Sequence, residues 1–214
     1  MNWRVKKELN SEDTIQILTR PLQELSLTAS AAQCSALARY AELVLEWNPK
    51  VNITGAKDVQ TFVAGPLFDA LTLLRVLEPC HRFVDIGSGG GLPAIPLCIF
   101  HPEIDVTMVE PRGKRVQFLQ MALTTLQLNA TVLHTQDREL SIPEFDGASA
   151  QAVFPPKKWL LRGKKLVRAG GAIYALSSEP VTDIMCPGGV SLETQQIFHR
   201  NETARYAARL RKTT

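Results

Sequence analysis

The sequence lacks a long apolar run, which excludes the simplest kind of membrane protein. A long uncharged stretch, Ile86 to Phe100, is interrupted by five glycines or serines and two prolines. A membrane-spanning helix needs about 18 or more consecutive apolar residues. The first eight residues are basic but lead into no apolar signal core. We therefore expect a cytoplasmic protein with no membrane partner.

Cysteine is also scarce, and its spacing gives no sign of a metal centre. The chain has four cysteines, which form no C-x-x-C pair and have no histidine at metal-ligand spacing: Cys34, Cys80, Cys98 and Cys186. We interpret them as isolated buried thiols. The prediction is a protein without a bound metal.

Charge of one sign is not in large excess, because the formal net charge of the 214 residues is only +3. Its distribution is more informative than its sum. Residues 157–168 contain six basic residues and no acid, and the segment from Arg200 to Lys212 contains five basic residues against a single acid, Glu202. Both segments are candidates for contact with nucleic-acid phosphates, and a solvated helix face is the alternative for the first.

The first third of the chain has the spacing of helices. With 45% hydrophobic and 21% charged residues, the composition is that of an ordinary globular protein. Apolar residues between Thr14 and Trp47 recur at helical intervals, Thr28-Ala29-Ser30 offers a capping residue for the second helix, and a third helix is expected from about Val63 to Leu77. Residues 1–80 are predicted to form an N-terminal helical layer.

From His81 onward, short apolar runs alternate with helical segments, which is typical of a parallel sheet covered on both faces. We expect strands at 83–86, 106–110, 131–134, 145–153 and 172–176. Helices are expected at 93–100, at 115–126, and from Pro156 to just before Gly170-Gly171, with one or two further strands in 190–210. The prediction is an α/β, Rossmann-like fold whose core spans residues 81–214.

The segment Asp85-Ile86-Gly87-Ser88-Gly89-Gly90-Gly91 lies directly between a predicted strand and a predicted helix. Glycines in such a loop allow a tight turn and let a ligand approach the main chain. The dinucleotide pattern G-x-G-x-x-G would need glycine at position 92, where the chain has Leu92. A bound pyrophosphate is therefore disfavoured, and a plain strand-to-helix turn remains the alternative.

Acidic residues around this loop favour a positively charged nucleoside. Asp85 would repel a phosphate but would accept hydrogen bonds from the cationic amino acid portion of S-adenosylmethionine. Glu110 ends the next strand, where a carboxylate can accept hydrogen bonds from ribose hydroxyls. Asp137 and Arg138 follow the third strand and are candidates to cover the adenine. For these charged residues, a solvated loop or strand end is the alternative.

Three motifs together resemble the RsmG or GidB family, the small-subunit (16S) ribosomal RNA guanine-7 methyltransferases. They are W-N-x-x-x-N-[LI]-T at residues 47–54, the glycine loop with Leu92-Pro93, and K-R-x-x-F-L at residues 114–119. The resemblance covers most of the chain. It implies a Rossmann-like methyltransferase fold, S-adenosyl-L-methionine as cofactor, and ribosomal RNA or the small ribosomal subunit as partner.

The resemblance also implies a set of site residues. The expected cofactor-binding residues are Asp85, Gly87, Ser88, Gly89, Gly91, Leu92, Glu110, Asp137 and Arg138. Asn52 matches the asparagine that the family has near the transfer site, and a turn-forming loop asparagine is the alternative. Asn52 and Gln151 are the candidate catalytic residues.

The chain departs from the family pattern at three polar positions. Gln151 stands where the family has the arginine of S-R-A, Ser177 where it has the lysine of A-L-K-G-E, and Pro66 where it has the histidine of H-x-L-D-S. The glycine loop is intact. The contrast suggests retained cofactor binding with altered, weakened or lost action on the usual RNA target. Restoring the arginine at position 151 is accordingly expected to raise the rate.

Methyl transfer to a guanine ring nitrogen needs alignment more than acid–base chemistry, because the nitrogen lone pair is available without deprotonation. A sequence without a histidine or cysteine in its motif loops fits that requirement. The leading hypothesis is a monomeric ribosomal RNA methyltransferase. The alternatives are an S-adenosylmethionine- or RNA-binding family member with a degenerate acceptor site, and a small-molecule methyltransferase.

Overall fold

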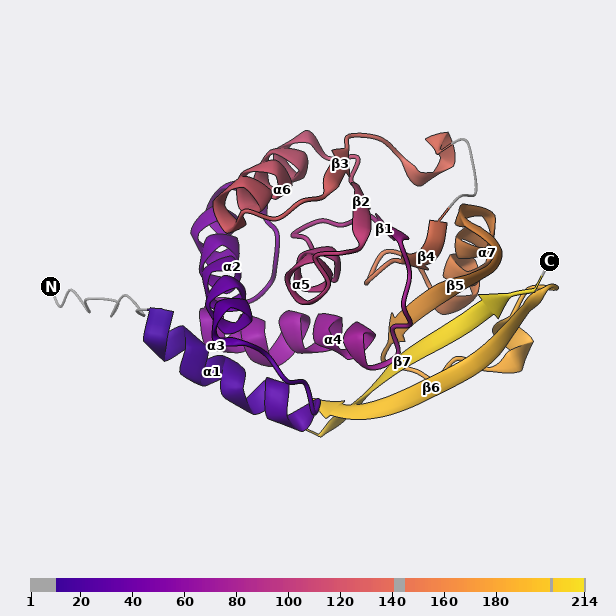
Figure 1. Cartoon of the computed structure of the whole chain (residues 1–214), viewed down its shortest axis with the longest axis horizontal. Coiled ribbons are helices and arrows are strands. Elements are labelled where there is room, and N and C mark those ends of the chain that lie inside the picture. The colour runs from indigo at the N-terminus through magenta and orange to yellow at the C-terminus, as the bar shows by residue number, and fades with distance from the viewer. Residues whose placement is uncertain (1–10, 141–144, 201, 214) are drawn as a thin grey trace, which may run out of the picture.

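A computed structural model describes residues 11–140, 145–200 and 202–213. Within these ranges the strands form a single seven-stranded sheet in the order β3-β2-β1-β4-β5-β7-β6 (Figure 1). The strands are β1 (Arg82–Ile86), β2 (Asp105–Val109), β3 (Thr131–Leu133), β4 (Phe145–Ser149), β5 (Val167–Ser177), β6 (Val190–Arg200) and β7 (Thr203–Lys212). Strands β1 to β5 pair in parallel, whereas β7 is antiparallel to both β5 and β6.

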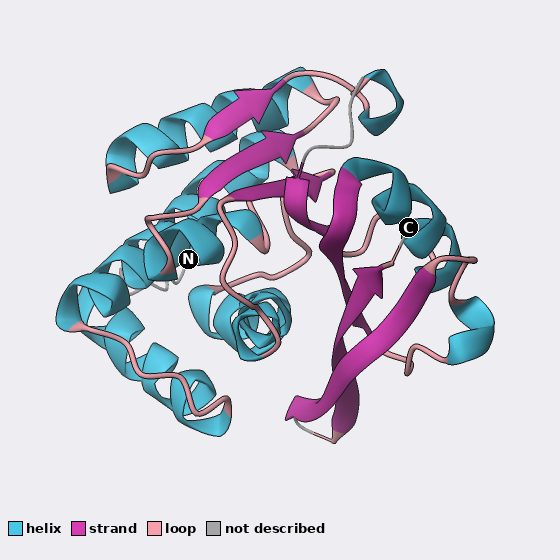
Figure 2. Cartoon of the chain, turned by 45° about the vertical axis from the view of Figure 1, so that its right-hand side comes forward, coloured by secondary structure: helices cyan, strands magenta, loops and turns pink. Residues whose placement is uncertain are grey.

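Helices lie on both sides of this sheet (Figure 2). The longer ones are α1 (Ser11–Glu24), α2 (Ala31–Val51), α5 (Ala94–Phe100), α6 (Gly113–Leu126) and α7 (Pro156–Leu166). A run of short helical segments connects α2 to β1: α3 (Val59–Phe62), η1 (Val63–Leu67), α4 (Phe68–Leu71) and η2 (Thr72–Arg75). Two short 3-10 turns, η3 (Asp137–Glu139) and η4 (Asp183–Met185), complete the set.

The N-terminal helices form as predicted, with defined ends. Ser30 caps α2 through a reciprocal capping box with Gln33, which satisfies backbone N–H groups at the helix start. Asn52 ends the helix in the left-handed conformation, at φ 53°. Pro21 lies inside α1 and does not divide it. The helix predicted from Val63 is instead a succession of short segments that begins at Val59.

Helix α7 ends at Leu166, before the Gly170-Gly171 pair as predicted, but β5 begins at Val167 and not at Ala172, so the pair lies inside the strand. Strand pairing between β4 and β5 shifts register near Phe145 and Gly147. A Cβ on Gly171 would lie 3.0 Å from the carbonyl oxygen of Asp146 and 2.9 Å from Val167 Cβ. Glycine is therefore needed here because two backbones approach closely at a strand irregularity.

Two apolar cores lie on opposite faces of the sheet, as the alternation of side chains along a strand requires. Phe83 and Tyr174 pack with the N-terminal helices, α5 and α6, and their ring centroids are 5.6 Å apart. Val84 and Ile173 belong to the other core, with α7. Residues before and after position 80 share the first core. The division into 1–80 and 81–214 stays a prediction.

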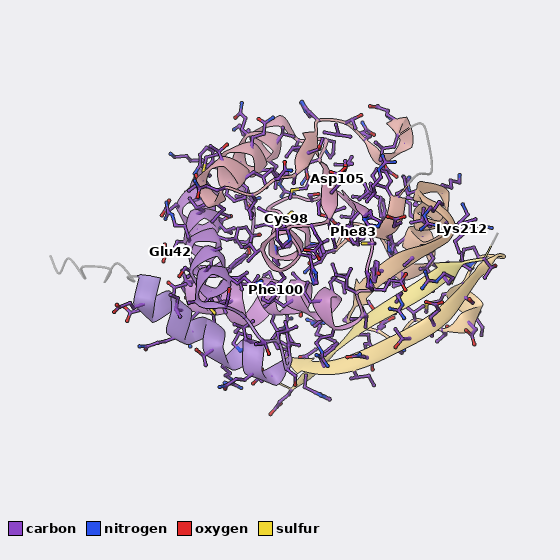
Figure 3. The ribbon with its side chains drawn as sticks, viewed as in Figure 1. Glu42, Phe83, Cys98, Phe100, Asp105 and Lys212 are labelled. Carbon is purple, nitrogen blue, oxygen red and sulfur yellow. The ribbon has the colours of Figure 1, made fainter. Side chains whose placement is uncertain are left out.

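The cysteines are only partly buried. Cys98, on α5, is buried among the side chains shown in Figure 3, whereas Cys34, Cys80 and Cys186 are half-buried. The expectation of four buried thiols was therefore correct for Cys98 alone. Among the described residues, no group of histidine, cysteine and acidic side chains could hold a metal ion, and no helix is long and apolar enough to cross a membrane.

Candidate functional site

The glycine loop between β1 and α5 has the left-handed backbone that its glycines predict. Gly87, Gly89 and Gly91 have φ values of 68°, 57° and 92°, which side chains with a Cβ rarely adopt. The N–H groups of Gly87 and Ser88 both donate to the carbonyl oxygen of Val109, at 2.7 and 3.2 Å. The loop is thus held against the end of the neighbouring strand β2.

Close packing explains why the loop needs glycine at positions 90 and 91 as well. A Cβ on Gly90 would lie 2.2 Å from Ile53 Cγ2, and one on Gly91 would lie 2.4 Å from Ile95 Cδ1. Tyr40 Oη donates to the carbonyl oxygen of Gly90 at 2.7 Å. Residues of the N-terminal layer therefore press directly on the loop.

Glu110 follows β2 and braces the loop from the other side. Its side chain is nearly buried, at 2% exposure. Oε2 accepts a hydrogen bond from the N–H of Gly89 at 2.9 Å, and Oε1 accepts one from the N–H of Arg112 at 2.9 Å. Each carboxylate oxygen has a further lone pair, so Glu110 can still accept a ligand hydroxyl.

Asp85, at the end of β1, is a fully buried acid with one unsatisfied oxygen. Oδ1 accepts a hydrogen bond from Ser149 Oγ at 2.7 Å, while Oδ2 has no hydrogen-bond partner among the described residues. Burial is the main cause that raises the pKa of this carboxyl to about 7. A cationic or hydrogen-bond-donating ligand group would satisfy the free oxygen.

The loop opens on a cavity of about 500 Å³, which we call the glycine-loop cavity. Six of the predicted site residues line it: Gly87, Ser88, Gly89, Leu92, Glu110 and Gln151. The other predicted residues do not appear on its wall. Asp85 is fully buried, and Gly91 packs against Ile95.

Asn52 lies beside this cavity but not on its wall. Its left-handed backbone and exposed side chain are those of a residue that ends a helix in a turn. Its neighbours Ile53 and Thr54 do line the cavity. The carbonyl oxygen of Asn52 accepts a hydrogen bond from Arg115 Nη2 at 2.8 Å. A catalytic role for Asn52 stays a prediction.

The structure brings the sequence motifs of residues 47–54 and 114–119 together. Asn48 Oδ1 accepts hydrogen bonds from the N–H groups of Ile53 and Thr54, at 2.7 and 2.9 Å, which fixes the first motif as a loop. The rings of Trp47 and Phe118 pack with centroids 6.0 Å apart. From the two motifs, Ile53, Thr54 and Arg115 line the glycine-loop cavity. Asn48 and Phe118 do not line it but support the residues that do, a role that the sequence analysis did not assign to them.

Asp137 and Arg138 are not brought to the glycine-loop cavity. The Asp137 carboxylate forms an ion pair with Arg162 on α7, and Arg138 is exposed. Their expected contact with adenine stays a prediction.

A second cavity, of about 430 Å³, lies at the ends of β4 and β5, and we call it the β5 cavity. Gln151 and Ala152 line both cavities, so the two spaces adjoin at these residues. Gln151 Nε2 donates to the carbonyl oxygen of Pro66 at 3.3 Å, while its Oε1 is buried with no hydrogen-bond partner among the described residues.

The three departures from the family pattern gather around this junction. Pro66 lines the glycine-loop cavity, Ser177 lines the β5 cavity, and Gln151 lines both. The hydroxyl of Ser177 donates to the carbonyl oxygen of Glu179. The sequence changes thus affect one continuous region.

A guanidinium nevertheless reaches the β5 cavity from the far end of the chain. Arg205, on β7, lines the cavity and forms an ion pair with Asp69 at 3.1 Å. Arg200, on β6, pairs with the other Asp69 oxygen at 2.7 Å. Burial raises the pKa of Asp69, and the two arginines oppose that shift. Sequence reasoning missed this pair, whose only signal was the arginine-rich C-terminal segment.

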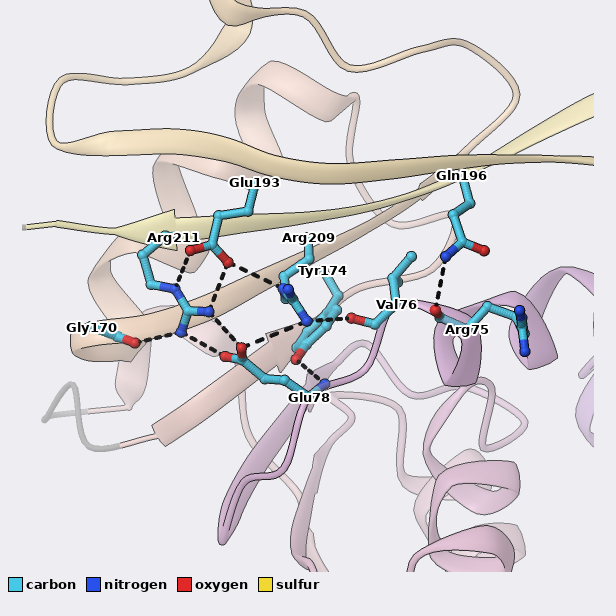
Figure 4. A network of polar contacts seen from close by, with 9 residues as sticks. All are labelled: Arg75, Val76, Glu78, Gly170, Tyr174, Glu193, Gln196, Arg209 and Arg211. Atoms are coloured by element: carbon cyan, nitrogen blue, oxygen red, sulfur yellow. Dashed lines mark hydrogen bonds and ion pairs between the residues drawn. The ribbon is translucent and has the colours of Figure 1, made fainter.

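The C-terminal arginines form internal ion pairs, which argues against the expectation that they grip phosphates. Arg211 contacts Glu78 and Glu193 at 2.5 and 2.7 Å, and Arg209 contacts the same two carboxylates at 3.6 and 3.1 Å (Figure 4). Lys212 Nζ donates to the carbonyl oxygen of Val167 at 2.9 Å. The arginines tie β6 and β7 to Glu78 in the segment before β1, and Lys212 ties β7 to the start of β5.

In the basic segment 157–168, only some of the basic side chains have such internal partners. Arg162 pairs with Asp137, Arg168 pairs with Asp146, and Lys164 Nζ contacts the carbonyl oxygen of Gly188. Three lysines remain exposed: Lys157, Lys158 and Lys165. These three are the better candidates for phosphate contact.

Solved structures confirm the Rossmann-like methyltransferase fold. TrmN from Thermus thermophilus matches with a TM-score of 0.55 and 23% identity, over 69% of this chain and 48% of that chain. TYW2 from M. jannaschii in complex with AdoMet matches with a TM-score of 0.53 and 13% identity, over 69% and 76%. MtNAS in complex with MTA and tNA matches with a TM-score of 0.56 and 14% identity, over 97% and 91%.

Sequence comparison is more specific than these fold similarities. Residues 33–200 match the GidB family, described as rRNA small subunit methyltransferase G. The protein of that name from Xanthomonas oryzae pv. oryzae (strain MAFF 311018) is 35% identical over 166 residues, covering 77% of each chain. Its namesake from Azoarcus sp. (strain BH72) is 37% identical over 155 residues, covering 71% of this chain and 73% of its own. The chain therefore belongs to the ribosomal RNA small subunit methyltransferase G family.

Proposed function

We propose that the protein transfers the methyl group of S-adenosylmethionine to nitrogen 7 of a guanine in small-subunit ribosomal RNA. Family membership supports the RNA methyltransferase activity. The observation that carries the proposal is that two cavities adjoin at Gln151 and Ala152. One cavity can hold the methyl donor and the other the acceptor.

The residues of the glycine-loop cavity fit the proposed cofactor. Glu110, on the wall of the cavity, retains lone pairs for ribose hydroxyls. Asp85 is not on the wall, but its buried Oδ2 lacks a partner among the described residues, which suits a positively charged amino acid group that reaches past the loop. The left-handed glycines keep side chains out of the loop. When bound, S-adenosylmethionine supplies an electrophilic methyl group on a sulfonium.

The protein's own contribution would be alignment of the acceptor and exclusion of water. No histidine or cysteine lines either cavity among the described residues. A guanine N7 lone pair needs no general base, so the wall residues have only to position the base. Tyr40, Glu110 and Arg115 hold the glycine-loop cavity in shape through hydrogen bonds to the main chain.

The test is methyl transfer to small ribosomal subunits prepared from cells that lack the modification. Labelled S-adenosylmethionine is supplied, the RNA is digested, and the methylated nucleoside is identified by mass spectrometry. We expect 7-methylguanosine. Label in a different nucleoside would contradict the proposal, as would label no higher than with heat-treated protein.

A second candidate function is cofactor or RNA binding with a degenerate acceptor site. It is favoured by the neutral groups at positions 66, 151 and 177 around the cavity junction. Under this candidate, wild type transfers slowly and Gln151→Arg raises the rate about tenfold, since a charged hydrogen bond exceeds a neutral one by about 1.4 kcal/mol. Rapid wild-type transfer with no gain in the variant would reject it.

We further propose that the protein acts as a cytoplasmic monomer on RNA and not on a small molecule. The exposed lysines of α7 support an RNA partner. Binding to ribosomal RNA that weakens with salt is expected, together with a sedimentation coefficient of a monomer. Salt-insensitive binding would favour a small-molecule acceptor.

A further inference from the structure

The β5 cavity is built as a separate binding site beside the glycine-loop cavity. Its volume of about 430 Å³ lies within the range of roughly 300–1,000 Å³ that is typical of small-ligand sites. Its wall includes residues from distant segments, among them Asp69, Phe154 and Tyr206. Because several elements contribute to its wall, the cavity is a feature of the fold and not of one loop. The chemistry of its wall indicates which class of ligand it binds.

The orientation of the Gln151 amide is fixed by its neighbour. Pro66 has a carbonyl oxygen that accepts the hydrogen bond from Gln151 Nε2. A flipped amide would place Gln151 Oε1 against that carbonyl, so two acceptors would face each other. Oε1 is therefore the atom left without a partner among the described residues, and it is buried where the two cavities adjoin. An unsatisfied buried acceptor destabilises the ligand-free protein, which favours a ligand that brings an N–H group.

Aromatic rings supply surfaces for a flat ligand. Phe154 and Tyr206 both line the β5 cavity and are half-buried. Arg162 and Lys158 lie over the Phe154 ring, at 4.8 and 5.6 Å from its centroid, and the Trp159 ring is stacked parallel to it at 6.4 Å. The cavity wall therefore already contains a stack of aromatic rings with cations beside it, and Tyr206 is a further ring. Aromatic and guanidinium planes are the groups on which unstacked nucleobases rest in protein complexes with RNA.

Exposed positive charge lies next to the cavity. Pro156 lines it and begins α7, and the two residues that follow, Lys157 and Lys158, are exposed. Ammonium groups at this position can contact the phosphates on either side of a base that has entered the cavity. A free small molecule would have no need of them.

From these observations we propose that the β5 cavity receives the target nucleobase, unstacked from its RNA, with an N–H group of the base donating to Gln151 Oε1. This inference rests on the proposed function. Guanine has such donors at N1 and at its 2-amino group. The neighbouring glycine-loop cavity would then present the methyl donor to the base.

The first test fills the β5 cavity without touching the other. Ser178 lines the β5 cavity and is exposed, so Ser178→Trp should block entry and leave the fold intact. Ser191→Trp, at an exposed position on β6 away from both cavities, is the matched control. We expect Ser178→Trp to lower kcat/KM for subunits at least tenfold with the Kd for S-adenosylhomocysteine within about twofold of wild type. A variant as active as Ser191→Trp would overturn the proposal.

The second test separates this inference from the proposed function. Wild-type protein, saturated with S-adenosylhomocysteine, is irradiated with 8-azidoguanosine 5′-monophosphate, and the labelled peptides are identified. Label is expected within residues 150–159, 175–179 or 205–206, and it should be lost in Ser178→Trp. Label elsewhere, or label that persists in that variant, overturns the cavity assignment even if subunits are methylated. Correct labelling without methyl transfer would contradict only the proposed function.

Gln151→Leu tests the fixed acceptor. The substitution removes both hydrogen-bonding atoms at similar size, so the cofactor Kd should stay within about twofold while kcat/KM for subunits falls about tenfold. A tenfold loss of cofactor affinity with unchanged kcat would show that Oε1 faces the cofactor, which would reject this part of the proposal.

Discussion

The glycine-loop cavity and the β5 cavity are neighbours, yet they are held in shape by different means. The first depends on main-chain hydrogen bonds around residues 85–112, such as those of Gly87 and Gly89. The second depends on side chains from distant segments, such as the Asp69–Arg205 ion pair. The glycine loop can therefore keep its shape while the sequence around it changes. This chain matches the family motif in the loop itself and departs from it at Pro66, Gln151 and Ser177, around the junction of the two cavities.

The largest effect is expected from breaking the first cavity at Gly89. Valine at φ 57° is strained, at a cost of about 1–3 kcal/mol, and its Cβ would lie 3.4 Å from Arg115 Nη1. Gly89→Val should weaken S-adenosylhomocysteine binding by about 10- to 100-fold in calorimetry. Gly188→Val is the control, since a Cβ there meets nothing within 4 Å. Equal binding by the two variants would show that the loop does not hold the cofactor.

The pH dependence of cofactor binding should expose the role of Asp85. Its pKa is raised to about 7, so the carboxyl must lose a proton before it can pair with a cationic ligand group. Affinity for S-adenosylhomocysteine should rise about tenfold between about pH 5.5 and 7.5, and Asp85→Asn should abolish the rise. Affinity that is flat with pH in wild type would argue against ion pairing at this position.

The same carboxyl should lower the stability of the ligand-free protein as the pH rises. The unfolded carboxyl ionises near its ordinary pKa of 3.8, whereas the folded one retains its proton until about pH 7. The free energy of unfolding should therefore fall between about pH 4 and 7, by an amount on the order of 3 kcal/mol. Denaturant titrations at about pH 5 and 8 should show a smaller fall for Asp85→Asn, provided that other groups contribute equally to both proteins.

The RNA contacts of α7 give a more moderate expected effect. Alanine at Lys157, Lys158 and Lys165 together should weaken RNA binding about tenfold and reduce the slope of log affinity against log salt by about 2 to 3. Filter binding at several salt concentrations measures both. An unchanged slope would show that these lysines do not contact RNA phosphates and that this face of α7 is simply solvated.

The smallest effect on RNA affinity is expected from the C-terminal arginines, because they are engaged internally. Arg211→Gln should leave the salt slope unchanged but destabilise the fold by about 1–3 kcal/mol, since Glu78 and Glu193 lose the nearer of their two shared partners and keep only Arg209. A urea titration measures the loss. A reduced salt slope in this variant would instead place Arg211 on the RNA.

The sequence alone predicted what depends on local interactions. The Ser30 N-cap, the parallel strands and the left-handed glycine loop follow from neighbouring residues and from apolar periodicity. The start of β5 was predicted too late, at Ala172, because glycine marks both element ends and strand irregularities, and only the pairing of β4 with β5 distinguishes them.

The second cavity was beyond local prediction for a physical reason. Arg205 reaches Asp69 only because β7 pairs antiparallel beside β5, and no short-range pattern specifies that pairing. The departure at Gln151 was visible, but its contact with Pro66 joins two segments that are far apart in sequence. The sequence shows that position 151 has no arginine, but it does not show that Arg205 brings another guanidinium to the same cavity.

The place of β7 has a consequence for how the protein matures. This strand is the last in the chain among those described, and it covers the edge of β5 while it carries Arg205 to the β5 cavity. During synthesis the glycine loop is made first, and the β5 cavity is completed only when the hairpin of β6 and β7 docks. A chain clipped before Thr203 would expose an open sheet edge, which invites aggregation, and would keep its glycine loop beside an incomplete β5 cavity.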